Sequence, residues 1–105
     1  MIVHLTGSSR SIEADHPYLR AIVDTIHAEG HVLARDWIEP AYKREVKNPQ
    51  AAEADWPVIF RDNIQAITRA DVVIVEATSY GFSQGFQLAS ALQQKKPTLL
   101  LWRAG

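Results

Sequence analysis

Apolar residues fall into two kinds of stretch along the chain. Short stretches rich in apolar and β-branched residues predict strands. The run from Val72 to Val75 is apolar without alternation, as expected of a central parallel strand that is covered on both faces. The predicted strands are 2–6, 31–37, 70–78 and 97–102.

Between these stretches, apolar residues recur at helical spacing. A first helix is predicted from Asp15 to Gly30, because these residue types start and stop helices. A second follows Asp55, whose side chain can cap it, and a third runs from about residue 83 to residue 94. The polar stretch 39–50 contains two prolines and predicts a long loop with room for a helical turn.

The alternation of strands and helices predicts an α/β fold. Right-handed crossovers between such strands give a parallel sheet, here a small doubly wound, flavodoxin- or Rossmann-like sheet of about four to five strands flanked by helices. The chain of 105 residues is expected to form one domain, 1–105. Ligands of doubly wound sheets bind beyond the carboxyl ends of the strands, where the loops after residues 6 and 78 are expected to meet.

Composition and charge exclude several classes of function. The formal net charge of -1 does not indicate a basic surface for binding a nucleic acid polymer or an anionic membrane. There is no cysteine, so disulfides and thiolate chemistry are excluded, and the histidines lack a metal-ligand spacing, so no metal site is expected. Apolar runs are too short to span a membrane and no secretory signal is visible. We therefore expect a cytoplasmic protein without a cofactor.

The loop after the first predicted strand has the composition of an anion site. Gly7 lets the backbone approach a ligand, Ser8 and Ser9 supply hydroxyl groups, and Arg10 supplies a planar fork suited to phosphate. The alternative is an ordinary turn rich in turn-forming residues. The loop lacks the lysine ending of a nucleoside triphosphate loop and the glycines of a dinucleotide loop.

Three stretches of the chain, taken in order, resemble sequences of the nucleoside 2-deoxyribosyltransferase superfamily. They are "VHLTGSSRS", "IFRDNIQAITRADVVIVEAT" and "GFQLASALQQKKPTLLLWR", and the likeness is closer to the 2'-deoxynucleoside 5'-monophosphate N-hydrolase branch. The resemblance implies cleavage of an N-glycosidic bond by a glutamate that attacks the anomeric carbon and forms a glycosyl-enzyme ester.

The resemblance also assigns roles to residues of this chain. It implies that Gly7, Ser8, Ser9 and Arg10 hold the 5'-phosphate. Asp62 matches an aspartate that orients the nucleoside, although a solvent-facing aspartate beside Arg61 is the structural alternative. The glycine-punctuated loop and helix start "SYGFSQGFQ" add further candidate substrate-binding residues, which are Gly81, Ser83 and Gly85.

Gln87 departs from the family at the position of the nucleophile. A carboxylate at this place would be anionic and favoured by the helix dipole, whereas an amide oxygen is a neutral and poor nucleophile. His4 stands where relatives often carry a tyrosine, and Gly81 stands where they carry an aspartate or serine that touches the sugar. Several departures around one pocket favour natural divergence, and we expect a binding domain whose bond cleavage is lost or weakened.

Two other hypotheses stay open at this stage. The first is an active N-glycosidase, hydrolase or deoxyribosyltransferase, that uses another carboxylate, with Asp62 and Glu76 as candidates or a carboxylate from a partner subunit. The second is a structural or interaction protein without enzymatic activity. Members of the resembled family assemble as dimers or larger species, and a short open sheet would expose an edge strand, so a homodimer is expected.

Overall fold

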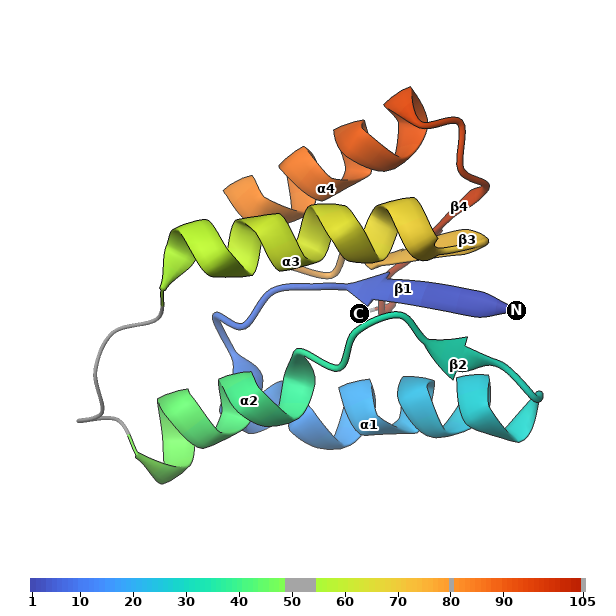
Figure 1. Cartoon of the computed structure of the whole chain (residues 1–105). Coiled ribbons are helices and arrows are strands. Elements are labelled where there is room, and N and C mark those ends of the chain that lie inside the picture. Colours follow the sequence, from blue (N-terminus) through green and yellow to red (C-terminus); the bar gives the residue numbers. More distant parts are fainter. Residues whose placement is uncertain (49–54, 80, 105) are drawn as a thin grey trace.

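The fold is α/β, with a parallel sheet between two layers of helices (Figure 1). The computed structural model describes residues 1–48, 55–79 and 81–104. The strands are β1 (Ile2–Thr6), β2 (Val32–Leu33), β3 (Val72–Glu76) and β4 (Thr98–Leu101). The helices are α1 (Ile12–Ala28), α2 (Ile38–Tyr42), the π-helix η1 (Lys43–Lys47), α3 (Trp56–Arg69) and α4 (Phe82–Gln93).

The sheet has the strand order β2-β1-β3-β4, and all three pairings are parallel. The chain winds outward from β1 to β2 and then crosses over to β3 on the other side of β1. Helices α1 and α2 lie on one face of the sheet and α3 and α4 on the other (Figure 1). This is the doubly wound arrangement that the sequence predicts, with its switch point between β1 and β3.

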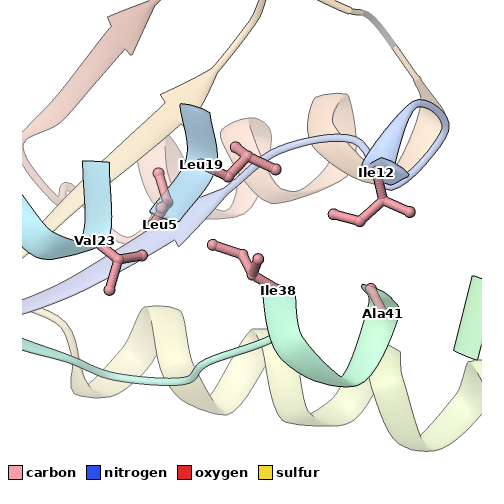
Figure 2. Packing of buried hydrophobic residues seen from close by; sticks show 6 residues of the cluster. All are labelled: Leu5, Ile12, Leu19, Val23, Ile38 and Ala41. Carbon is pink, nitrogen blue, oxygen red and sulfur yellow. The ribbon is translucent and has the colours of Figure 1, made fainter. Parts of the chain in front are cut away.

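Two apolar clusters fix the helices to the sheet. On one face, Leu5 of β1 packs with side chains from α1 and α2 (Figure 2). Ile38 is 1% exposed and belongs to this cluster, so it anchors the short helix α2. On the other face, Val73 and Val75 of β3 pack with Ile67, Ala70 and Ala91. Burial on both faces explains why the run from Val72 to Val75 shows no alternation.

Helix α1 begins earlier than the sequence indicates. The predicted start was Asp15, but the helix begins at Ile12 and ends at Ala28. Ile12 is buried in the cluster with Ile38, and this burial makes an additional helical turn favourable. Asp15 is instead paired with Arg103, with 2.7 Å between its Oδ1 and the guanidinium Nη2. The prediction of Asp15 as the helix start was therefore wrong.

The segment after α1 also differs from the prediction. The strand expected at 31–37 is confined to Val32–Leu33. Beyond it, the Asp36 carboxylate accepts a hydrogen bond from the Ile38 amide at 3.0 Å and turns the chain into a helix. The loop expected at 39–50 is helical from Ile38 to Lys47, and its last two residues lie outside the described part of the chain.

The remaining elements follow their sequence signals closely. Asp55 caps α3, because its Oδ1 accepts a hydrogen bond from the Val58 amide at 3.2 Å. Helix α4 begins at Phe82 after Gly81, within one residue of the predicted start. The loops that follow β1 and β3 therefore emerge side by side at the carboxyl edge of the sheet.

Candidate functional site

A pocket of about 300 Å³ opens at the carboxyl edge of β1 and β3. It is bounded by the loop after β1, by α2 and η1, and by the starts of α3 and α4. The sequence-predicted residues that line it are Gly7, Ser8, Ser9, Gly81, Ser83 and Gln87. The structure thus brings together residues from both loops that the sequence singles out, at the place where doubly wound sheets bind ligands.

Three sequence-predicted residues do not line this pocket. Arg10 is exposed and borders a separate surface depression with Ser11 and Glu13. Gly85 lies on the exposed side of α4, where an added Cβ would meet nothing within 4 Å. Asp62 pairs with Arg61 of the same helix, with 3.3 Å between the carboxylate and the guanidinium.

Gln87 lies at the buried end of the pocket and is held on both sides. The side-chain oxygen of Gln87 lies 2.8 Å from His4 Nε2, and its amide nitrogen donates a hydrogen bond to the Ser83 hydroxyl at 3.1 Å. Since an amide oxygen only accepts, His4 donates from Nε2. Gln87 is 4% exposed and His4 is fully buried. The amide is therefore fixed in one orientation.

His4 is held in its neutral form. Burial lowers the pKa of His4 below its ordinary value of 6.5, the hydrogen bond to Gln87 partly opposes this, and the charges of Arg35 and Arg69 lower the pKa further. The Nδ1 atom of His4 is buried and has no hydrogen-bond partner among the described residues. A neutral imidazole with its proton on Nε2 matches the Gln87 oxygen that it faces.

Glu76 is buried at the end of β3 but is occupied by its neighbours. It accepts hydrogen bonds from the Tyr18 hydroxyl at 2.5 Å and from the Thr78 amide and hydroxyl at 2.5 and 3.0 Å. Burial raises the pKa of Tyr18, and its hydrogen bond to Glu76 raises it further, so Tyr18 stays a donor at neutral pH. Glu76 borders a small cavity near Arg103 and does not line the pocket that contains Gln87.

Several pocket residues were not indicated by the sequence. They are Arg35, Trp37, Arg44, Trp56, Asn63 and Phe82. Arg35 follows β2 and therefore emerges at the same carboxyl edge as the two predicted loops, which is the signal that could have found it. Arg44 lies in η1, within a stretch expected to be a loop. No aspartate or glutamate lines this pocket among the described residues, whereas two arginines do.

An apolar groove continues from this pocket between α3 and α4. It encloses about 150 Å³ and shares Trp56, Phe82 and Gln87 with the first pocket. Phe60 and Phe86 both line it and are in a tilted aromatic contact, with their ring centroids 4.5 Å apart. Trp56 is 59% exposed and Phe82 is 91% exposed. The two cavities together form one cleft. Its two arginines line only the first cavity, Phe60 and Phe86 line only the groove, and Trp56 and Phe82 line both.

No family model matches the chain, and no curated protein sequence matches it. The likeness to deoxyribosyltransferases therefore rests on the sequence motifs alone. In residues 1–48, 55–79 and 81–104, no helix has the length and apolar character needed to cross a membrane. The same part of the chain holds no group of three or more histidine, aspartate or glutamate side chains arranged to bind a metal ion.

Proposed function

We propose that this protein binds a nucleoside or nucleoside 5'-monophosphate in the cleft and that its ability to cleave the N-glycosidic bond is lost or weakened. The observation that carries the proposal is the position of Gln87. Gln87 lines the pocket and stands at the sequence position where the resembled family carries a nucleophilic glutamate, and its amide is hydrogen-bonded to His4 and Ser83. An amide fixed in this way positions a ligand but does not attack an anomeric carbon.

The composition of the pocket supports the loss of cleavage. General acid–base and nucleophilic steps on glycosidic bonds use carboxyl groups placed beside the bond. Among the described residues, neither Asp62 nor Glu76 lines the pocket. Asp62 is paired with Arg61, and Glu76 accepts three hydrogen bonds from Tyr18 and Thr78. For either of them to act as a replacement nucleophile, its carboxylate would need to leave these partners.

The shape of the cleft supports a nucleotide as the ligand class. Small-molecule sites combine an apolar wall with a few polar groups that fix orientation. Trp56 and Phe82 offer exposed aromatic faces on which a base can stack. The serine hydroxyls of the loop after β1 offer partners for a sugar or phosphate. A flat aromatic group joined to a polar group fits this distribution.

A homodimer and a cytoplasmic location belong to the same proposal. β4 lies at the edge of the sheet, and its Leu99 and Leu100 side chains are 50% and 45% exposed. Exposed apolar edge strands are commonly covered by a partner. The absence of cysteine is compatible with a reducing compartment. Light scattering at high protein concentration tests the dimer, and a monodisperse monomer contradicts it.

The experiment for cleavage is chromatographic detection of free base from deoxynucleosides and their 5'-monophosphates. The native protein is compared with Gln87→Glu, which restores a carboxylate at the pocket, and with Gln93→Glu, which adds the same charge at an exposed position of α4. We expect base release from Gln87→Glu alone and calorimetric binding of nucleotide by all three proteins. Base release by the native protein at the rate of Gln87→Glu or faster overturns the loss or weakening of cleavage, and the absence of nucleotide binding overturns the proposed ligand.

A further inference from the structure

Two arginines from neighbouring elements line one wall of the pocket. Arg35 follows β2 and Arg44 lies in η1. Arg35 Nη1 donates a hydrogen bond to Asn63 Oδ1 at 2.7 Å, so its guanidinium is fixed against α3. Arg44 Nε lies 3.1 Å from the Glu45 carboxylate, which is half exposed and outside the pocket lining. The wall therefore presents two positive charges to the cavity.

The carboxylates that act on these two arginines are Asp36, Asp62 and Glu45, and none of them lines the pocket. Burial lowers the pKa of Arg35, Asp62 and Asp36 raise it, and repulsion from Arg44 lowers it. An arginine nevertheless stays protonated at neutral pH, because its ordinary pKa is far above 7. Among the described residues, the pocket lining holds both guanidinium groups and no carboxylate. Like charges that share a desolvated cavity are stabilised by an anion placed between them.

The remaining donors of the cavity fit a tetrahedral anion. Ser8, Ser9 and Ser83 line the same pocket and carry hydroxyl groups that donate as well as accept. A guanidinium group presents several N–H donors in a planar fork, and Arg35 uses one of them in the described part of the chain. Two such forks and several hydroxyls match the oxygens and the double negative charge of a phosphate monoester better than a single carboxylate.

We infer that Arg35 and Arg44 form a phosphate-binding end of the cleft that takes a phosphate monoester. The inference rests on the proposed function, because its natural ligand would be the 5'-phosphate of the bound nucleotide. It departs from the motif-based expectation, which assigned the phosphate to the loop from Gly7 to Arg10. Arg10 does not line this pocket and borders another depression, so its guanidinium is not part of this end of the cleft. The aromatic residues of the adjoining groove then face the base.

Isothermal titration calorimetry tests this inference with four probes. These are deoxynucleoside 5'-monophosphates, the matching nucleosides, 2-deoxyribose 5-phosphate and inorganic phosphate. The variants are Arg35→Ala, Arg35→Lys, Arg44→Ala and Arg10→Ala, with Lys43→Ala as the matched control, since Lys43 is an exposed cation beside Arg44. Thermal melting of each variant identifies any loss of folding, and Arg35→Lys keeps the charge while losing the planar fork.

We expect Arg35→Ala and Arg44→Ala each to weaken monophosphate binding by about 10- to 100-fold, with Arg35→Lys in between. Arg10→Ala and Lys43→Ala should bind as the native protein does. Monophosphate binding that depends on Arg10 and not on Arg35 or Arg44 overturns the inference and leaves the proposed function standing. A third outcome is that deoxyribose phosphate or inorganic phosphate binds and depends on Arg35, but no nucleotide binds. This outcome supports the anion site and overturns the proposal that the ligand is a nucleotide. No binding of any probe overturns both.

Discussion

His4 Nε2 and Gln87 Oε1 lie 2.8 Å apart at the buried end of the pocket, although 83 positions separate these residues along the chain. The contact joins β1 to α4 across the switch point of the sheet. It fixes the protonation of the histidine and the orientation of the amide together, because the amide oxygen requires a donor. Gln87 is thus part of a buried, neutral hydrogen-bond pair.

The burial of His4 makes the stability of the protein depend on pH. Because the folded pKa of His4 is lowered, the unfolded chain takes up a proton at this residue near pH 6.5, while the folded chain takes it up only at a lower pH. The contribution of His4 to stability is therefore fully present above pH 6.5 and is lost as pH falls below that value. For one such group, the slope of the free energy of unfolding against pH cannot exceed about 1.4 kcal/mol per pH unit. Urea unfolding between pH 5 and 8 measures it.

His4→Gln is the control for this pH dependence. A glutamine side chain keeps a terminal N–H donor toward Gln87 but does not titrate in this range. Below pH 6.5, we expect the free energy of unfolding of His4→Gln to depend less steeply on pH than that of the native protein. An unchanged slope in His4→Gln means that other groups cause the acid destabilisation.

Gln87→Glu should raise the pKa of His4. A carboxylate oxygen at the place of the amide oxygen stabilises the imidazolium form by a charge-assisted hydrogen bond and by Coulomb attraction. The pKa of His4 in the variant should therefore lie above that in the native protein, which NMR titration of the imidazole resonances measures. Gln93→Glu, at the exposed end of α4, should leave the His4 titration unchanged. An equal shift in both variants contradicts the direct contact.

Ile38 should anchor α2, which bounds one side of the pocket, and its burial should contribute strongly to the stability of the protein. It is 1% exposed and packs against α1 and β1 (Figure 2). We expect Ile38→Ala to lower the free energy of unfolding by about 2–5 kcal/mol and Ile38→Val by about 0.5–1.5 kcal/mol. Leu92→Ala removes an apolar side chain that is 59% exposed and should change it by less than about 0.5 kcal/mol. Equal effects in Ile38→Ala and Leu92→Ala would contradict the buried position of Ile38.

The sequence predicts the sheet well because its signals are local. β1 coincides with the predicted strand 2–6, and β3 and β4 lie within 70–78 and 97–102. The start of α1 was wrong because burial of Ile12 against Ile38 is a tertiary contact that helical spacing does not reveal. The strand predicted at 31–37 was too long because Asp36 turns the chain into α2.

The candidate site could be predicted only in its loops. Doubly wound topology alone places the loops after β1 and β3 at one edge, and Gly7, Ser83 and Gln87 do line the pocket there. The sequence does not predict Arg44 as a pocket residue, because its helix η1 is stabilised by packing and has no strong local sequence signal. Arg10 lies in the short connection between β1 and α1 and does not line the pocket, and its residue type does not reveal this.

The ends of α1 and α4 allow a matched test of backbone strain. Both helices end with the same pair of hydrogen bonds, Gly30 N to His27 O and His31 N to Ile26 O in α1, and Lys95 N to Leu92 O and Lys96 N to Ala91 O in α4. Gly30 has φ +83, and Lys95 has φ 58, a left-handed conformation that side chains disfavour.

Lys95→Gly should therefore raise the free energy of unfolding by about 1 kcal/mol, the relief of the left-handed strain less the added entropy of the unfolded chain. Lys95→Ala keeps the strain while removing the charge, so it should lie close to the native protein. Gly30→Ala should destabilise by about 1 kcal/mol for the same reason, since nothing lies within 4 Å of the added Cβ and φ alone opposes it. Urea unfolding compares the three variants. If Lys95→Ala raises the free energy of unfolding as much as Lys95→Gly does, the destabilising effect of Lys95 comes from its charge and not from its backbone conformation.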